Sequence, residues 1–420
     1  MKILIKGGRV IDPKAVVDKI TDLAIENGII TKIGSLEPTG FDQVIDATDK
    51  WVTPAFVDTH VHLREPGFED KEDLISGTRA GLKGGFSDLV AMPNTRPTMD
   101  TLTKYEDLLE RIENKALIRV HPTGAITMGL AGKEQAQMQA MGKAGAIAFT
   151  DDGHTTMDDT LMENAFLVAK SYGRIVTTHS EDHDVTAHIK DRPAPNTAES
   201  DVVVRDIRLA EKTGGALHVG HVSTKEALKA IKEARVKGID VSCEVTPHHI
   251  ALAHGEDGID AGAGRFKVNP PIRSQADRQA VIQAIQEGTI EMIATDHAPH
   301  EMHTKQDSYE TSSYGFTGLE TSFAVAYTAL VRRGHISEAH LIKLMTYAPA
   351  KRFGIEAGNL DLGKPANLVL LDPHAKWTVK GEAFVSKGKN TPFEGMTFYG
   401  KVTDTWVNGE HKLQGGHIHA

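Results

Sequence analysis

The amino-acid sequence predicts a mixed α/β fold: a (β/α)8 TIM-like barrel with a small β-sandwich module formed by both termini. Eight short apolar runs, each ending in polar residues, alternate with stretches of helical periodicity through the middle of the chain. This alternation is typical of parallel strands with crossover helices. A doubly wound open sheet would show it too. The polar residues that end the runs favour the barrel, because only a barrel brings all eight carboxyl ends to one mouth.

Both ends of the chain are expected to be rich in strands. Residues 22–34 and 403–413 each hold an Asn-Gly pair between apolar residues, which is a strong signal for a β-hairpin. The other strand-like segments are 2–12, 365–372 and 397–402. We therefore expect residues 1–53 and 356–420 to form the β module together, with residues 54–355 as the barrel between them.

The apolar runs mark the expected barrel strands, and amphipathic segments between them mark helices. The runs are FVDTHVH (56–62), SDLVAMPN (87–94), IRVHPTGAI (118–126), AIAFTDDG (146–153), RIVTTHSE (174–181), ALHVGHVS (216–223), DVSCEVTPHH (240–249) and EMIATDHAPH (291–300). Residues 71–85 and 225–238 have the period of an amphipathic helix. Their expected buried faces hold Leu74, Ile75, Thr78, Leu82, Leu228, Ile231 and Val236.

Charge and composition narrow the class of protein. The chain has 420 residues, with 47 Lys and Arg against 57 Asp and Glu, so its formal net charge is −10. This balance argues against nucleic acid or an anionic membrane as the main partner. We see no run of 18 apolar residues and no signal-peptide core. The single cysteine, Cys243, indicates a reducing compartment such as the cytoplasm and is expected to be a buried apolar residue.

Histidines and aspartates at the ends of five runs predict a metal centre. Side chains alternate along a strand, so His60 and His62 face the same side and can bind one ion together. Nitrogen and oxygen ligands of this kind are those that Zn²⁺ prefers. The remaining candidates are Asp151 or Asp152, His179, His221 and Asp296. Together they offer six ligands, enough for two ions that share a carboxylate.

A binuclear centre indicates hydrolytic chemistry. Two metal ions that share a carboxylate can also share a hydroxide, which is a nucleophile near neutral pH, and can polarise a carbonyl group. A carboxylate beside them can carry a proton to a leaving nitrogen. The sequence therefore favours hydrolysis of an amide, imide or ester, or its reversal.

Several motifs together resemble the bacterial class I dihydroorotases of the amidohydrolase superfamily. They are DTHVHLREPG, AMPNTRP, AFTDDG, EVTPHH, KVNPPIR, ATDHAPH, GLET and SKGKNTPFEG, and they extend from the first barrel run to about position 400. Such enzymes interconvert (S)-dihydroorotate and N-carbamoyl-L-aspartate in de novo pyrimidine (UMP) biosynthesis. The resemblance therefore implies a cyclic amide hydrolase acting on a small molecule.

The resemblance also implies roles for the predicted ligands. His60, His62 and Asp296 would hold the first zinc ion, and His179 and His221 the second. Asp152 would bridge the two ions of each chain together with a hydroxide; spacing alone does not choose it over Asp151. Asp296 would be the catalytic acid and base. The neighbours His248 and His249 are expected to be structural.

Further residues are expected to bind the substrate. Arg64 shares the face of His62, and its guanidinium suits a carboxylate, although a salt bridge at the rim is the alternative. The resemblance adds His62, Asn94, Asn269 and His300, together with backbone groups of Tyr314 and Gly315. As alternatives, Asn94 and Asn269 could be simple turn residues. The polar stretch 301–315 is either a loop that orders over substrate or plain loop.

Three departures and several alternatives accompany this interpretation. The fourth run lacks the lysine with which hydantoinases bridge their metals, which argues against a hydantoinase or allantoinase. Tyr314 stands where the family has Phe, and the segment between His179 and His221 is shorter than expected. An inactive, dihydroorotase-like scaffold for aspartate transcarbamoylase is the alternative from another class, but all six ligands are present. The family further suggests a homodimer.

Overall fold

Eight strands form where the eight apolar runs predicted them. The computed structural model describes residues 1–305 and 308–419. The strands are β6 (Phe56–Val61), β7 (Phe86–Ala91), β8 (Arg119–Pro122), β9 (Ala148–Phe149), β10 (Ile175–Thr178), β11 (Leu217–Val219), β12 (Val241–Val245) and β13 (Met292–Ile293). They make two parallel sheets, β6-β7-β8 and β9-β10-β11-β12-β13. Isolated parallel bridges join the sheets at both sides, Gly124 to Phe149 and Val61 to His297.

These strands are apolar because they are covered on both faces. Every residue of β6, β7, β10 and β12 is buried, as expected for parallel strands whose crossover helices cover the sheet. Cys243 in β12 has no exposed surface, which confirms that it is buried. In this way the apolar runs fix the strands, and the polar residues that follow them are left at the carboxyl ends.

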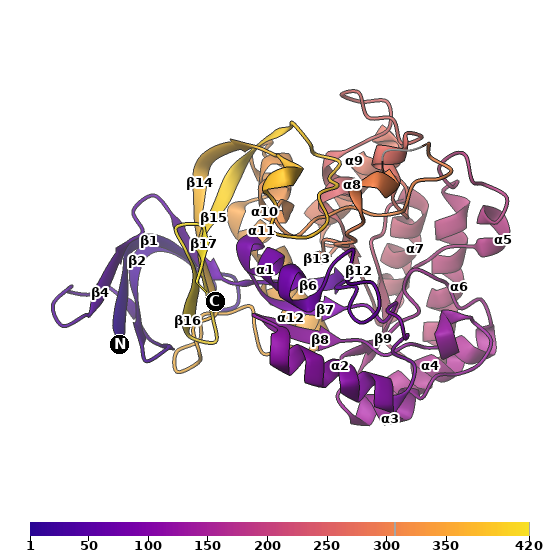
Figure 1. Ribbon diagram of the computed structural model, residues 1–420, viewed down its shortest axis with the longest axis horizontal. Coiled ribbons are helices and arrows are strands. Elements are labelled where there is room, and N and C mark those ends of the chain that lie inside the picture. Colours follow the sequence, from indigo (N-terminus) through magenta and orange to yellow (C-terminus); the bar gives the residue numbers. More distant parts are fainter. Residues whose placement is uncertain (306–307, 420) are drawn as a thin grey trace.

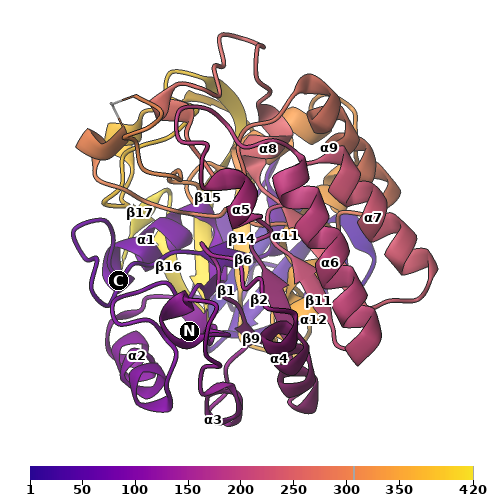
Figure 2. The same ribbon diagram turned by 90° about the vertical axis from the view of Figure 1, so that its right-hand side faces the viewer.

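Helices surround these strands on the outside. Figure 2 shows α4, α6 and α7 side by side on the outer side of strands β9 and β11. The longer helices are α1 (Leu74–Gly84), α2 (Leu102–Lys115), α4 (Asp159–Ser171), α6 (Thr197–Thr213), α7 (Lys225–Val236), α9 (Gln275–Glu287) and α11 (Glu338–Met345). The shorter ones are α3 (Met138–Lys143), α5 (His183–Thr186), α8 (Pro247–Ala251), α10 (Ser322–Ala326) and α12 (Tyr347–Phe353).

The sequence determines where α1 begins and ends. The side chain of Asp73 accepts a hydrogen bond from the backbone N–H of Ser76, and the Ser76 hydroxyl accepts one from the backbone N–H of Asp73. This reciprocal pair is a capping box. Gly85 ends the helix in the left-handed region at φ 88°. Two expected core positions were wrong: Ile75 is 47% exposed and Val236 is 84% exposed. Ile75 lies at the edge of the buried stripe of α1, whereas Val236, the last residue of α7, lies on the face opposite the buried residues of that helix.

A nine-stranded sheet joins the two ends of the chain. Its members are β1 (Lys2–Asp12), β2 (Val17–Glu26), β3 (Ile29–Gly34), β4 (Gln43–Asp46), β5 (Trp51–Pro54), β14 (Leu368–Thr378), β15 (Thr397–Val407), β16 (Glu410–Gln414) and β17 (His417–Ile418). Strand β5 pairs with both β1 and β14. Figure 1 shows the indigo N-terminal strands beside the yellow C-terminal ones, with both termini near this sheet.

The two predicted Asn-Gly hairpins are present and touch each other. Asn27 and Asn408 have φ 51°, and the glycines that follow are also left-handed, which is the geometry of a tight hairpin turn. A Cβ atom added at Gly409 would lie 2.4 Å from the carbonyl oxygen of Gly28. The glycines therefore let one turn from each end of the chain pack against the other.

Among residues 1–305 and 308–419, no helix is both long enough and apolar enough to cross a membrane.

Candidate metal centre

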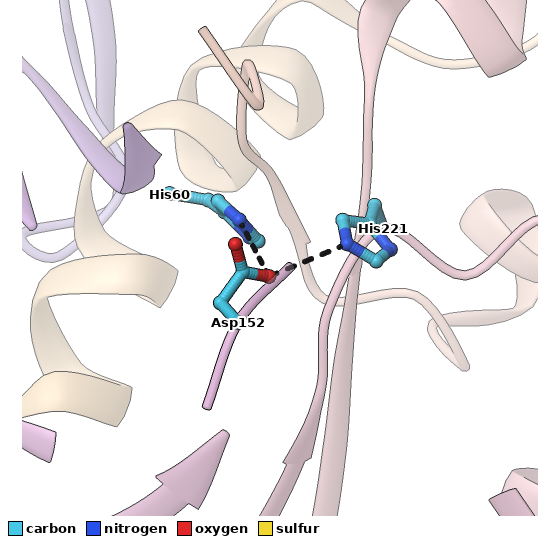
Figure 3. A group of neighbouring side chains, drawn as sticks. All are labelled: His60, Asp152 and His221. Carbon is cyan, nitrogen blue, oxygen red and sulfur yellow. Dashed lines mark ion pairs between the residues drawn. The ribbon is translucent and has the colours of Figure 1, made fainter. Parts of the chain in front are cut away.

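The structure brings all six predicted ligands to the carboxyl ends of five strands. Two groups of side chains could each hold an ion, and their candidate ligand atoms lie within 4.8 Å of one another. They are His60, Asp152 and His221, and His60, His62 and Asp296. Figure 3 shows the first group, in which His60 and His221 approach the same carboxylate from different elements. All six predicted ligands are buried, with at most 6% exposed.

Asp152 lies at the centre of the cluster. Its Oδ1 is 3.2 Å from His60 Nε2 and 3.7 Å from His221 Nε2. The other oxygen, Oδ2, is 3.4 Å from His62 Nε2. His179 also faces this carboxylate, with 3.7 Å between Nδ1 and Oδ1. One carboxylate thus faces four imidazoles with its two oxygens.

Asp296 lies against the other side of the histidine pair. Its Oδ1 is 3.0 Å from His62 Nε2 and 3.7 Å from His60 Nε2. Asp296, His221 and Arg64 all have a positive φ, of 48°, 31° and 64°. Non-glycine residues rarely adopt this region, and such strained positions gather at functional sites. The backbone therefore turns these side chains into the cluster at an energetic cost.

Neighbouring side chains orient the imidazoles. His60 Nδ1 lies 2.8 Å from Glu244 Oε1, and His62 Nδ1 lies 2.9 Å from Asn94 Oδ1. Because those oxygens can only accept, each Nδ1 donates, and Nε2 is the nitrogen that faces the cluster. Sequence reasoning missed Glu244, since a single acidic residue within an apolar strand carries no signal of its own.

Electrostatics favour ionised carboxylates here. Burial alone would raise the pKa of Asp152, but the surrounding imidazoles, His60 first, hold that pKa well below its usual range. The pKa of Asp296 is likewise lowered to about 2, because His62, His60 and His221 outweigh its burial. Conversely, burial opposes charge on His60, but Asp152 and its neighbours raise the pKa of that imidazole well above normal. The centre therefore has ionised oxygen ligands ready for a cation.

Asp151 lies outside the cluster. Its Oδ1 accepts hydrogen bonds from the backbone N–H groups of Ile126 and Thr127 at 2.8 and 3.0 Å. Its Oδ2 accepts from the hydroxyls of Thr127 and Thr156. With its oxygens engaged in this way, Asp151 holds the loop behind the centre. Asp152 is the member of the pair that faces the histidines.

The expected substrate residues line one cavity of about 370 Å³ with five of the ligands on its wall. Its lining includes His62, Arg64, Asn94, Asp152, His179, His221, Asn269, Asp296, His300, Tyr314 and Gly315. His60 lies deeper, beneath that lining, with 1% of its surface exposed. The cavity is of the size that small-molecule sites usually have.

Several of these groups already contact one another. His300 Nε2 lies 2.6 Å from the carbonyl oxygen of Tyr314, so this nitrogen carries the proton. Burial, together with the Arg64 guanidinium, lowers the pKa of His300 to about 2. Arg64 donates from Nε to the carbonyl oxygen of Pro299 at 3.3 Å. The Gly315 N–H donates to the carbonyl of Lys267.

Asn269 has a partner that sequence reasoning did not identify. Its Nδ2 donates to Glu181 Oε2 at 2.6 Å, and the same carboxylate oxygen lies 3.3 Å from His179 Nε2. The structure thus joins Asn269 to the orientation of His179, while its side chain still lines the cavity. Glu181 is the last residue of the fifth apolar run, and its position there gave no reason to single it out.

The remaining sequence expectations fall around this centre. His249 is buried between Thr246 Oγ1 and the carbonyl oxygen of Pro270, and His248 stacks edge-on against Phe316. Neither belongs to the two candidate metal groups found in the described part of the chain. In the polar stretch 301–315, residues 306–307 lie outside the described residues. Lys305 is buried and donates to the carbonyl oxygens of Lys267 and Ser313.

The cluster fits a cation. His60 Nε2 and Asp152 Oδ1 are buried, and neither has a hydrogen-bond partner within the described residues. Buried polar atoms are nearly always satisfied, so these two atoms are suited to bind one cation together. Imidazole nitrogen with carboxylate oxygen is the donor set of zinc sites.

Comparison with known sequences gives the class of the protein. The profile of the Amidohydrolase family matches residues 51–412. This is most of the chain, so the chain belongs to the amidohydrolase family.

Within that family the closely related sequences are dihydroorotases. The dihydroorotase of Anaeromyxobacter dehalogenans strain 2CP-1 is 42% identical over 419 residues, covering 97% of this chain and 96% of that protein. The dihydroorotase of Ruminiclostridium cellulolyticum is 38% identical and covers 97% and 98%. These matches place the chain among the dihydroorotases and confirm the resemblance predicted from its motifs.

Solved structures confirm the fold shared with this family. The L-hydantoinase (dihydropyrimidinase) of Arthrobacter aurescens superposes with a TM-score of 0.90 at 24% identity, covering 100% of this chain and 97% of that one. The dihydropyrimidinase of Brevibacillus agri NCHU1002 gives 0.89 at 23% identity, covering 100% and 96%. At such identities the likeness concerns the fold alone.

Proposed function

We propose that this protein is a zinc-dependent dihydroorotase that interconverts (S)-dihydroorotate and N-carbamoyl-L-aspartate in pyrimidine biosynthesis. Its membership of the dihydroorotases supports the substrate. The observation that carries the proposal is the buried cluster of four imidazoles and two carboxylates, all of which except His60 line one cavity together with the Arg64 guanidinium. A cyclic amide that carries a carboxylate fits this cavity, because its amide can face the metal ligands while its carboxylate faces the Arg64 guanidinium.

The candidate ligands divide between two ions. His60, His62 and Asp296 would hold one zinc ion, His179 and His221 the other, and Asp152 would be a ligand common to both. When bound, such a pair supplies a nucleophile from water near neutral pH and polarises the carbonyl that is attacked. Family membership and the donor set support this assignment.

The residues of the chain would bind the substrate and move the proton. Asp296, ionised because its pKa is about 2, takes the proton from the attacking water and passes it to the ring nitrogen as the C–N bond breaks. Arg64, Asn94 and His300 hold the substrate carboxylate, and Asn269 faces the ring. Backbone groups at Tyr314 and Gly315 would complete the contacts after exchanging their present partners.

The fold proposed for this function is a closed eight-stranded barrel, residues 54–355, attached to a β-sandwich made by residues 1–53 and 356–420. The two bridges between the parallel sheets support closure. Pairing of β5 with strands from both ends of the chain supports the composite module. The homodimer suggested by the family stays a prediction that light scattering can check.

A substrate panel tests the proposed function. Zinc-loaded protein is incubated with dihydroorotate, hydantoin and allantoin, and ring opening is followed for each. We expect turnover of dihydroorotate at least about 100-fold above the others, because the guanidinium has a carboxylate to bind only in that substrate. Turnover of hydantoin or allantoin in its place would retire the proposal in favour of another cyclic amidohydrolase.

Metal analysis of the same preparation tests whether the protein is an inactive scaffold and not an enzyme. An inactive scaffold for aspartate transcarbamoylase should hold little zinc and should open none of the three rings. Protein with two zinc ions per chain and dihydroorotate turnover excludes that role as its sole function. Association with the transcarbamoylase stays a prediction, for which co-purification with that enzyme is the test.

A further inference from the structure

A segment from the C-terminal part of the chain lies against the substrate side of the cavity. Between β14 and β15, the backbone N–H groups of Val385 and Ser386 donate to Glu320 Oε1 at 2.8 and 3.1 Å. A Cβ atom added at Gly388 would lie 2.5 Å from Pro299 Cβ and 2.7 Å from Thr317 Oγ1. The glycine therefore permits an approach that brings the next residues of this segment to the cavity wall.

The side chain of Asn390 joins two parts of that wall. Its Oδ1 accepts from the backbone N–H of His300 at 3.3 Å, and its Nδ2 donates to the carbonyl oxygen of Gly315 at 3.0 Å. Its own carbonyl oxygen accepts from the N–H of Thr317 at 2.9 Å. Asn390 is only 5% exposed, so water does not compete freely for these contacts.

We propose that Asn390 is a positioning residue for the substrate carboxylate. It does not line the cavity but sets the spacing between His300 and Gly315, which do. The two stretches also contact each other directly, through the ring of His300 against the Tyr314 carbonyl and through the Ala298 N–H, which donates to the Phe316 carbonyl at 2.8 Å. The inference rests on the proposed function, since it assigns a role within that carboxylate site.

An asparagine is chemically suited to this position. Its amide presents one acceptor and one donor at a fixed spacing, matching one N–H and one C=O group. Aspartate keeps the size but replaces the donor with a second acceptor, which faces the Gly315 carbonyl and repels it. Alanine removes both contacts. A small displacement of the groups that hold a substrate has a large effect on its binding.

The test compares Asn390→Ala and Asn390→Asp with the wild type as zinc-loaded, full-length protein. We expect the KM for dihydroorotate to rise about tenfold in each, as loss of such buried contacts implies. We expect kcat to change by less than about threefold and zinc content to stay at the wild-type value. The inhibition constant of orotate, which carries the same carboxylate, should rise in parallel with KM.

Asn367→Ala is the matched control. Asn367 is also buried, accepts from the backbone N–H of Asn408 and donates to the carbonyl oxygen of Pro365, but lies in the terminal sheet region. It should lower thermal stability without changing KM, because none of its contacts touches the cavity. A general loss of stability is thereby separated from positioning.

The outcomes distinguish this inference from the proposed function. A wild-type enzyme that turns over dihydroorotate, with an unchanged KM in both Asn390 variants, would overturn the positioning role alone. Failure of both variants to fold would also overturn it, because Asn390 would then be structural; Asn390→Asp decides if only the alanine variant fails. A wild type that does not turn over dihydroorotate would overturn both proposals.

Discussion

Single side chains determine which nitrogen of each imidazole faces the metal centre. Glu244 accepts from His60 Nδ1 and also contacts His218 Nε2, at 2.8 and 3.1 Å. Because burial is outweighed by these imidazoles, the pKa of Glu244 is lowered and the carboxylate stays ionised. It therefore holds His60 by Nδ1, so that Nε2 is the nitrogen that faces the metal centre. The same principle applies to His62 through Asn94.

Glu244→Gln should weaken zinc binding by about 10- to 100-fold, the usual effect of removing the partner of a metal-binding histidine. The amide loses the charge and presents a donor to one of its neighbours. Zinc affinity is measured by competition with a chelator. Glu199→Gln, another buried glutamate, which accepts from Ser223 and Thr224, is the control. Equal zinc affinity in Glu244→Gln and wild type would refute the orienting role.

Arg64→Met should raise the KM for dihydroorotate by about 10- to 100-fold, because a charge-assisted contact to the carboxylate is lost. Zinc content should not change, since the guanidinium is not a ligand. Arg96→Met removes a nearby cation that stacks on Phe68 and serves as the control for charge. Steady-state kinetics of both variants measure the effect. An unchanged KM in Arg64→Met would show that the carboxylate is held elsewhere.

The sequence was informative for residues that carry metal chemistry and uninformative for those that support them. His60, His62, Asp152, His179, His221 and Asp296 follow apolar runs, and the parallel strands bring them together. Glu181, Glu244 and Asn390 each contact a residue that is far away in the sequence. Contacts of this kind leave no local pattern, so only the structure reveals them.

At the scale of elements, periodicity predicted the strands better than the buried faces of helices. Parallel strands covered on both sides have continuous apolar sequences, and each of the eight runs overlaps one strand. The prediction for Ile75 was wrong because helical periodicity does not give the width of the covered stripe. The prediction for Val236 was wrong because this residue does not follow Ile231 at the i+3 or i+4 spacing of one helical face. The contact between the two Asn-Gly turns was also invisible, since it joins opposite ends of the chain.

Gly409→Ala tests the packing of these turns. Gly409 has φ 85°, and a methyl group there would lie 2.4 Å from the Gly28 carbonyl oxygen. We expect a loss of unfolding free energy of about 3 kcal/mol or more, from strain and collision together. Gly288→Ala, at φ 78° with open space around it, should cost only about 1 kcal/mol. Chemical denaturation measures both, and equal losses would contradict the contact.

At the scale of the whole molecule, Glu320 connects the region around the eight strands to the C-terminal segment. Burial raises the pKa of its carboxyl to about 7, although the backbone N–H groups of Ser386 and Val385 oppose the shift. The folded protein therefore holds this proton more tightly than the unfolded chain. The resulting stability is fully present below about pH 4.5 and is lost as pH rises through about 7.

Glu320→Gln should remove this pH dependence. The variant and the wild type should differ little near pH 4.5, and the variant should be the more stable at pH 8, by on the order of 2 kcal/mol. Glu113→Gln, on the exposed side of α2, controls for the loss of one charge. Urea unfolding across this range measures the difference. A gap that does not grow between pH 4.5 and pH 8 would contradict the raised pKa.

The whole fold serves to bring five strand ends to one buried cluster, and the central claim is that this cluster holds two zinc ions. Anomalous diffraction at the zinc absorption edge, from crystals of the purified protein, tests the claim most directly. We expect two peaks on either side of Asp152, one beside His60, His62 and Asp296 and the other beside His179 and His221. A map without a peak among these side chains, from protein that turns over dihydroorotate, would contradict the account.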